Sequence, residues 1–92
     1  MSGTTLNAGD LTARQRQILF RAWHRGMREM DLLMGAFADA VLTTMPEEEL
    51  AEFEKILMYP DADLFKWFKG DEIIPEEYDS PVLRRFLAFR LT

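Results

Sequence analysis

The feature that most constrains the fold is a run of apolar residues that recur every three or four positions between Met30 and Met45. This spacing places one continuous apolar stripe along an α-helix. We therefore expect this segment to be the central core helix, with its methionines filling gaps in the core. Gly35 weakens such a helix by roughly 1 kcal/mol relative to alanine, and a close helix crossing would explain it. The stripe consists of Met30, Leu33, Met34, Phe37, Ala38, Val41, Leu42 and Met45.

Four shorter segments also show helical spacing, and no segment shows the alternation of a β-strand. The first runs from Asp10, a possible N-cap, to Gly26, and its core residues are Leu11, Ile18, Leu19, Ala22 and Trp23. The third expected helix presents Leu50, Phe53 and Leu57 to the core, the fourth contains Leu64, Phe65, Trp67 and Phe68, and the fifth contains Val82, Leu83, Phe86, Leu87 and Leu91.

The expected helix ends follow from residues with known positional preferences. Pro46 ends the second helix, and Thr44 with Glu47 forms a possible capping box for the third. Asp61 or Asp63 is expected to cap the fourth helix. Gly70 is expected to end the fourth helix, and Ser80 with Pro81 to begin the fifth.

These elements predict an all-α fold, a small five-helix bundle in a single domain. The 92-residue length suits one domain with a modest core. Residues 1–10 are small and polar and are expected to be a disordered N-terminal segment, so that the helical domain covers residues 11–92. The apolar stretches are too short for membrane insertion, and residues 1–10 do not resemble a targeting signal. We expect a cytoplasmic protein.

Charge is distributed unevenly along the chain. Residues 1–30 carry a net charge of +3, residues 46–79 carry −9, and the last thirteen residues carry +3. Most of these charges suit a solvated helical surface, but complementary patches toward a protein partner are the more specific interpretation. The total of −5 argues against nucleic acid as the main partner.

The sequence offers few groups for catalysis. It has no cysteine and only one histidine, His24. A single histidine argues against a histidine-rich metal site. His24 is expected to be a surface residue. Glu29 and Asp31 are two positions apart, which on a helix puts them on different faces. A small helical chorismate mutase also uses arginines and a carboxylate, but it needs a very long first helix, and Gly26 and Pro46 divide this chain into shorter pieces.

The junction between the first two helices concentrates charge. The segment from Arg25 to Asp31 reads Arg-Gly-Met-Arg-Glu-Met-Asp, with two arginines and two carboxylates around Gly26. A glycine adopts a left-handed turn at little cost. Arg25 and Glu29 have the i, i+4 spacing of a helical ion pair, although Gly26 interrupts the helix. The alternative is that these charges contact a partner.

This segment resembles the R-G-x-x-E motif of the SdhE family of FAD assembly factors, the bacterial relatives of mitochondrial succinate dehydrogenase assembly factor 2. A second segment, from Asp63 to Trp67, reads Asp-Leu-Phe-Lys-Trp and is similar to the D-L-[FY]-x-W segment of that family. The resemblance covers roughly residues 12–90. It implies a five-helix bundle, in agreement with the helices expected from periodicity.

The resemblance also implies a function. Members of the family promote covalent attachment of FAD to a histidine of the flavoprotein subunit of succinate dehydrogenase, and of fumarate reductase in bacteria. It implies that Arg25, Gly26 and Glu29 lie on the client-binding surface, and the adjacent Arg28 and Asp31 are expected to contribute. The chain would then be a bacterial assembly factor and not an enzyme, a monomer that binds no cofactor of its own, because FAD is the cofactor of the client. A small helical regulatory module, such as an antitoxin, remains the alternative.

Overall fold

The computed structural model describes residues 4–90 and shows five α-helices and no strand among them, so the predicted all-α five-helix bundle is confirmed. Short 3-10 turns, at Ala8–Asp10, Leu42–Thr44 and Glu76–Tyr78, accompany the helices. The helices are α1 (Ala13–Trp23), α2 (Arg28–Val41), α3 (Glu47–Ile56), α4 (Asp61–Lys69) and α5 (Pro81–Ala88). The expected core residue Leu91 lies outside the described residues.

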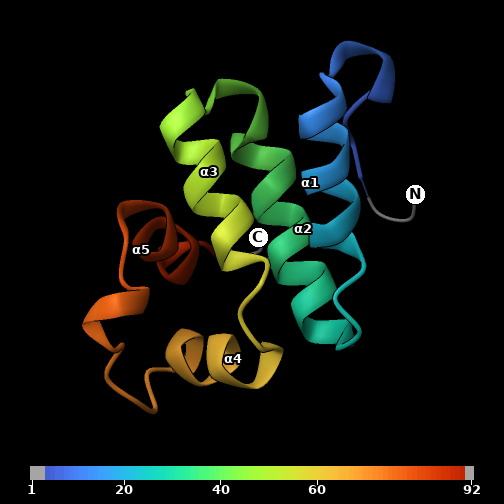
Figure 1. Cartoon of the computed structure of the whole chain (residues 1–92). Helices are drawn as coiled ribbons and strands as arrows, with labels where there is room; N and C mark the ends of the chain where they lie inside the picture. Colours follow the sequence, from blue (N-terminus) through green and yellow to red (C-terminus); the bar gives the residue numbers. More distant parts are fainter. Residues whose placement is uncertain (1–3, 91–92) are drawn as a thin grey trace.

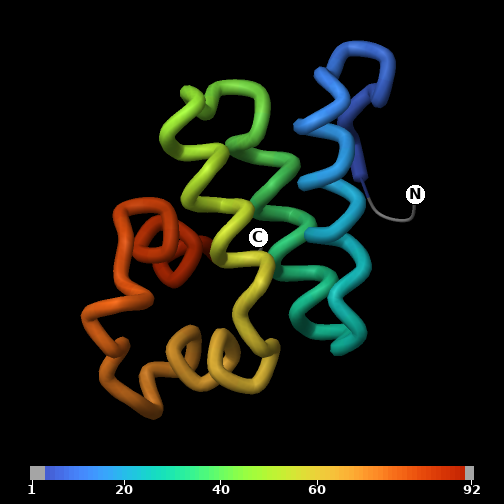
Figure 2. The backbone as a smooth tube through the Cα atoms, viewed as in Figure 1, coloured from blue at the N-terminus to red at the C-terminus, as the bar shows by residue number. Residues whose placement is uncertain are grey.

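The first three helices stand side by side, with α2 between α1 and α3 (Figure 1). They run down, up and down, as the backbone tube shows, and α4 then crosses beneath α3 before the chain turns up into α5 (Figure 2). None of the described helices combines the length and the apolar character that a transmembrane span requires.

The core is built around α2, as its periodicity predicts. Met30, Met34 and Ala38 are fully buried, and Phe37 is 2% exposed. The Phe37 ring lies 5.5 to 5.6 Å from three other phenylalanine rings, two of them from α3 and α5, at angles typical of aromatic packing. The core residues expected for the first helix are also buried: Ile18, Leu19, Ala22 and Trp23 lie in α1, and Leu11 lies just before it.

A close helix contact explains Gly35. A Cβ atom at this position would lie 2.2 Å from Cδ2 of the Trp23 indole, closer than any real contact. The missing side chain therefore lets the flat indole of α1 lie directly on the backbone of α2. This close packing offsets the lower helix propensity of glycine at position 35.

Two helix ends agree with the sequence prediction. Gly70 ends α4 in the left-handed region with φ +81°. The Ser80 hydroxyl accepts a hydrogen bond of 3.1 Å from the backbone N–H of Leu83, and Pro81 is the first residue of α5.

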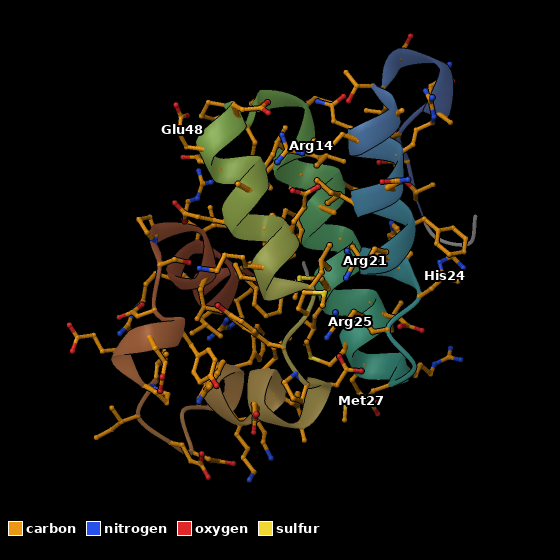
Figure 3. The ribbon with its side chains drawn as sticks, viewed as in Figure 1. Arg14, Arg21, His24, Arg25, Met27 and Glu48 are labelled. Atoms are coloured by element: carbon orange, nitrogen blue, oxygen red, sulfur yellow. The ribbon has the colours of Figure 1, made fainter. Side chains whose placement is uncertain are left out.

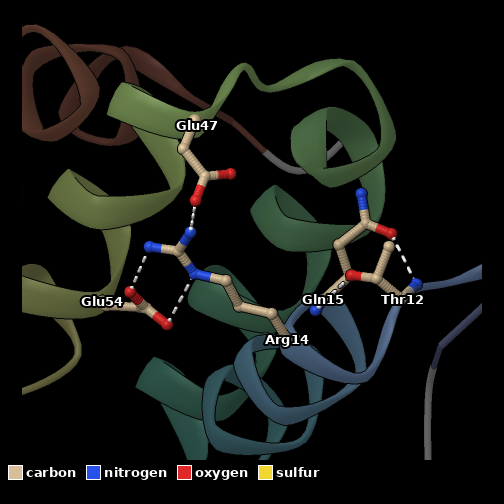
Figure 4. A network of polar contacts seen from close by, with 5 residues as sticks. All are labelled: Thr12, Arg14, Gln15, Glu47 and Glu54. Carbon is tan, nitrogen blue, oxygen red and sulfur yellow. Dashed lines mark hydrogen bonds and ion pairs between the residues drawn. The ribbon is translucent and has the colours of Figure 1, made fainter.

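Three predicted caps are wrong. Thr12, not Asp10, caps α1, because its hydroxyl and the Gln15 side chain form a reciprocal capping box (Figure 4). The Thr44 hydroxyl donates to the Val41 carbonyl, and α3 begins after Pro46 without a side-chain cap. In α4 the cap position is Pro60, and neither aspartate of the first turn caps the helix.

Over the described residues 4–10, the N-terminal segment forms hydrogen bonds to α2. The Asp39 carboxylate of α2 accepts hydrogen bonds from the Thr4 hydroxyl at 2.7 Å and from the Thr5 backbone N–H at 2.8 Å. It also accepts one from the Trp23 indole at 3.2 Å. A single carboxylate thus holds the segment against α2, which the composition of residues 1–10 does not reveal.

Arg14 links α1 to α3. Its guanidinium donates to both carboxylate oxygens of Glu54, at 2.7 and 3.1 Å, and also to Glu47 (Figure 4). The bidentate hydrogen bond from Arg14 lowers the pKa of the Glu54 carboxyl below its ordinary value of 4.5.

The Gly35 contact predicts the effect of adding a methyl group. Gly35→Ala gains about 1 kcal/mol of helix propensity, but it forces the indole of Trp23 to move, and overpacking of this kind costs about 1–3 kcal/mol. We expect a lower free energy of unfolding in urea. Ala51→Gly, at an exposed position of α3, measures the propensity effect alone. A Gly35→Ala variant more stable than the wild type would contradict the contact.

The Arg14–Glu54 pair predicts a pH dependence. Since the folded pKa of Glu54 is lowered, the pair stabilises the fold above the ordinary value of 4.5, and this contribution disappears as the pH falls through the folded pKa. Glu54→Gln should therefore lower Tm near neutral pH, and the difference from the wild type should close in acid. Glu48→Gln, exposed and unpaired among the described residues, is the control for thermal unfolding. A difference that persists unchanged in acid would rule out this role.

Candidate functional site

The corner, residues 25–31, joins α1 to α2 through a loop that contains Gly26. Gly26 has φ +103°, a conformation that residues with side chains rarely adopt. It is exposed, and a Cβ atom built on it meets nothing within 4 Å. The backbone conformation therefore strongly favours glycine here, and the space above it is open.

Asp31 fixes the loop from inside α2. Its carboxylate accepts hydrogen bonds from the backbone N–H groups of Arg25 and Gly26, the latter at 3.2 Å. Its own backbone N–H donates to the carbonyl of Met27 at 2.8 Å. Asp31 therefore satisfies loop N–H groups that would otherwise face solvent, and it lies near the positive N-terminal end of α2.

The Arg25 side chain turns inward and is only 8% exposed. Its guanidinium donates to Oδ1 of Asp61 at 2.7 Å, to the carbonyl of Tyr59 at 2.6 Å and to the carbonyl of Leu57. It thus reaches across to the connection between α3 and α4 (Figure 3). The expected i, i+4 pair with Glu29 does not form, because all three contacts are to this connection.

These contacts bring the two segments of the family resemblance together. Asp61 opens the helix that contains the segment from Asp63 to Trp67, and Trp67 is 7% exposed. The ring of Tyr59, whose carbonyl binds Arg25, packs edge-on against Trp67 with ring centroids 6.3 Å apart. Burial raises the pKa of Tyr59, and the nearby Tyr78 contributes.

Arg28 and Glu29 point away from this network. Both are exposed, and neither has an ion pair or a side-chain hydrogen bond within residues 4–90. Leu32, one helical turn further along α2, is 43% exposed. In the corner, Arg25 and Asp31 thus hold the loop through contacts within the fold, whereas Arg28 and Glu29 are available to contact another molecule.

Sequence reasoning misses the residues that hold the corner. It predicts Asp61 only as a possible helix cap, and the carbonyls of Leu57 and Tyr59 give no signal in a sequence. His24 is exposed as expected, and its Nδ1 lies 2.7 Å from the carbonyl of Phe20. Within the described residues, no group of three side chains from histidine, cysteine, aspartate or glutamate is placed to hold a metal ion.

Comparison with known proteins identifies the family. Residues 16–90 match the protein family described as flavinator of succinate dehydrogenase. The chain belongs to this family. It is 46% identical over 78 residues to the FAD assembly factor SdhE of Acetobacter pasteurianus, a match that covers 85% of this chain and 72% of the relative.

Other flavinator relatives come from bacteria and from mitochondria. The FAD assembly factor SdhE of Idiomarina loihiensis is 34% identical over 67 residues, which cover 73% of this chain and 74% of the relative. The mitochondrial succinate dehydrogenase assembly factor 2 of Dictyostelium discoideum is 34% identical over 70 residues, which cover 76% of this chain and 50% of the relative. The chain therefore spans about half the length of this mitochondrial relative. No solved structure matches the chain.

The flavinator family consists of assembly factors, so the expectation of an assembly factor in place of an enzyme is confirmed. The resemblance drawn from the two short segments is confirmed as well. The matched range includes the whole corner and all of α4.

The inward position of Arg25 predicts a stability difference between two arginines. Arg25→Ala leaves Asp61 and two carbonyls without their donor, and breaking a largely buried pair of this kind costs about 3 kcal/mol. Arg28→Ala removes the same charge three residues away at an exposed position, and should change the free energy of unfolding by less than about 0.5 kcal/mol. Urea unfolding of both variants tests this. Equal losses would show that the Arg25 contacts do not stabilise the corner.

Proposed function

We propose that this chain binds the flavoprotein subunit of succinate dehydrogenase and promotes covalent attachment of FAD to a histidine of that subunit. The family assignment and the names of the relatives support this proposal. The observation that carries it for this chain is the corner itself, where a buried arginine holds two exposed charges, unpaired within residues 4–90, in a fixed position.

The corner residues have two roles in the proposed interface. Gly26, Arg28 and Glu29 contact the client directly, because they are exposed and the space above Gly26 is open. Arg25 and Asp31 support the interface from behind through their contacts within the fold. A backbone that is already fixed loses little conformational freedom on binding, which favours affinity.

The proposed mechanism is assistance, with the chemistry supplied by the client and its cofactor. The client contributes the histidine and FAD contributes the electrophile, so this chain needs no nucleophile and no FAD site of its own. Holding the client so that histidine and flavin meet in reactive geometry accelerates the reaction. We further propose that the chain acts as a monomer in the bacterial cytoplasm, and that the flavoprotein subunit of fumarate reductase is a second client.

A flavinylation assay tests this proposal. The apo flavoprotein subunit is incubated with FAD, with and without this chain, and covalent flavin is read by in-gel fluorescence after denaturation. We expect faster accumulation of the fluorescent band with the chain present. Identical time courses with and without it, in a subunit that can still be flavinylated, would contradict the proposed function.

Glu29 provides the sharpest test of the surface. Within the fold it contributes only a favourable charge at the N-terminal end of α2, worth about 0.3–1 kcal/mol. Truncating a charged side chain that is buried and paired in a complex typically costs about 2–5 kcal/mol of binding free energy. Glu29→Ala should therefore keep nearly the wild-type Tm but lose most binding and flavinylation.

One control variant and one further test variant accompany this experiment. Glu48→Ala removes an exposed glutamate from the first turn of α3 and should bind as the wild type does. Gly26→Asn keeps a residue type that tolerates positive φ but adds a side chain to the open space. We expect it to fold and to bind weakly. Wild-type affinity of Glu29→Ala for the purified subunit would remove Glu29 from the interface.

A further inference from the structure

The exposed surface of α1 carries arginines that form no ion pair within the described residues. No acidic residue occurs from residue 11 to residue 28, whereas five arginines do. Arg14 and Arg25 are paired with carboxylates of α3 and α4.

Arg16, Arg21 and Arg28 form no ion pair within residues 4–90. Arg16 donates to the carbonyl of Leu11 at 2.6 Å, and Arg21 donates to Sδ of Met58 at 3.1 Å. The hydrogen bond from Arg14 lowers the pKa of the Glu54 carboxyl, and the positive charge of Arg21 also helps to lower it. A chain with a net charge of −5 thus keeps a local cationic edge.

An aromatic platform lies in the middle of this edge. Phe20 is 52% exposed, and its ring stacks on the imidazole of His24 with centroids 4.0 Å apart and an interplanar angle of 16°. His24 projects from the outer side of α1, away from α2 and α3 (Figure 3). A large apolar ring held rigidly in solvent is typical of residues that anchor protein interfaces.

The surface beside Phe20 is hollowed. A shallow groove of about 700 Å³ lies along α1, and Arg16 and Arg21 are among the residues that line it. Its lining residues are Ala13, Arg16, Gln17, Phe20 and Arg21. We call this surface, together with His24, the α1 outer face. It adjoins the corner in the chain, because exposed His24 is only two residues from exposed Gly26.

We propose that the α1 outer face is a second contact surface for the same flavoprotein subunit and receives an acidic segment of it that carries an apolar side chain. The inference rests on the proposed function. Charge complementarity favours an acidic segment with an apolar side chain, because two arginines without an ion pair in the described chain line the same groove as the exposed ring of Phe20. The continuity with the corner selects the same client, since one rigid partner can cover both surfaces at once. The strongly acidic remainder of the chain disfavours a polyanion such as nucleic acid or an anionic membrane.

The test measures binding of full-length variants to the purified apo flavoprotein subunit. Phe20→Ala removes the anchor, and Arg16→Glu with Arg21→Glu reverses the flanking charge. We expect each to weaken binding by about tenfold or more, and the charge reversal to reduce the salt dependence of the affinity. The flavinylation rate at subsaturating concentrations should fall in parallel.

Matched controls come from other exposed positions. Ile73→Ala removes an apolar side chain that is 94% exposed on the loop before α5. Lys55→Glu reverses an exposed charge of α3 that has no ion pair within the described residues. Both controls should bind as the wild type does, and circular dichroism should show unchanged helicity for all variants.

The outcomes separate this inference from the proposed function. If the wild type binds, Glu29→Ala does not, and the α1 variants bind normally, the inference is overturned and the proposed function stands. If the wild type does not bind the subunit, both are overturned. Vesicles with anionic lipid and single-stranded DNA serve as alternative probes. A further outcome is that the wild type binds one of these polyanions, and that the Arg16→Glu, Arg21→Glu variant loses this binding while it still binds the subunit normally. This result overturns the inference in favour of that polyanion.

Discussion

The corner depends on one guanidinium group. Arg25 donates to the carbonyls of Leu57 and Tyr59, where α3 ends, and to the carboxylate of Asp61, where α4 begins. A cation is favoured at the negative end of one helix, and an acid is favoured at the positive end of the next. The planar fork of arginine can satisfy several acceptors at once, which a lysine ammonium on a flexible stem does less well. One side chain thereby fixes the loop between α1 and α2 relative to α3 and α4.

This arrangement explains how a short chain presents charge without a large scaffold. The buried side of the corner is satisfied by contacts within the fold, so the outward residues Arg28 and Glu29 need no internal partner. Gly26 helps to separate the buried and exposed sides of the corner, since its positive φ turns the chain and leaves open space above the backbone. Residues that hold the loop and residues available for recognition therefore lie within the same seven positions of sequence.

The arginines of α1 and the adjoining Arg25 divide in the same way. Arg14 and Arg25 bind carboxylates across the bundle, whereas Arg16 and Arg21 remain without such partners on the described surface. Arg14 is paired with α3. The guanidinium of Arg21 instead donates to Sδ of Met58, just after α3, and that of Arg16 donates to the carbonyl of Leu11, so neither of these two arginines forms an ion pair within residues 4–90. The arginine-rich first part of the sequence thus places positive charge on the exposed surface of α1.

The sequence by itself determined the helices, the central place of α2, and the helix ends at Gly70 and Ser80, because periodicity and these caps act over a few neighbouring residues. The two short segments also identified the family. Only the tertiary structure decided that Arg25 faces inward, that Asp61 binds it instead of capping α4, and that Asp39 holds residues 4 and 5. An aspartate after a turn can cap a helix or pair with a distant cation, and local sequence does not distinguish these outcomes. The choice depends on which side chains, 34 to 36 residues apart, the packed helices bring within hydrogen-bonding distance.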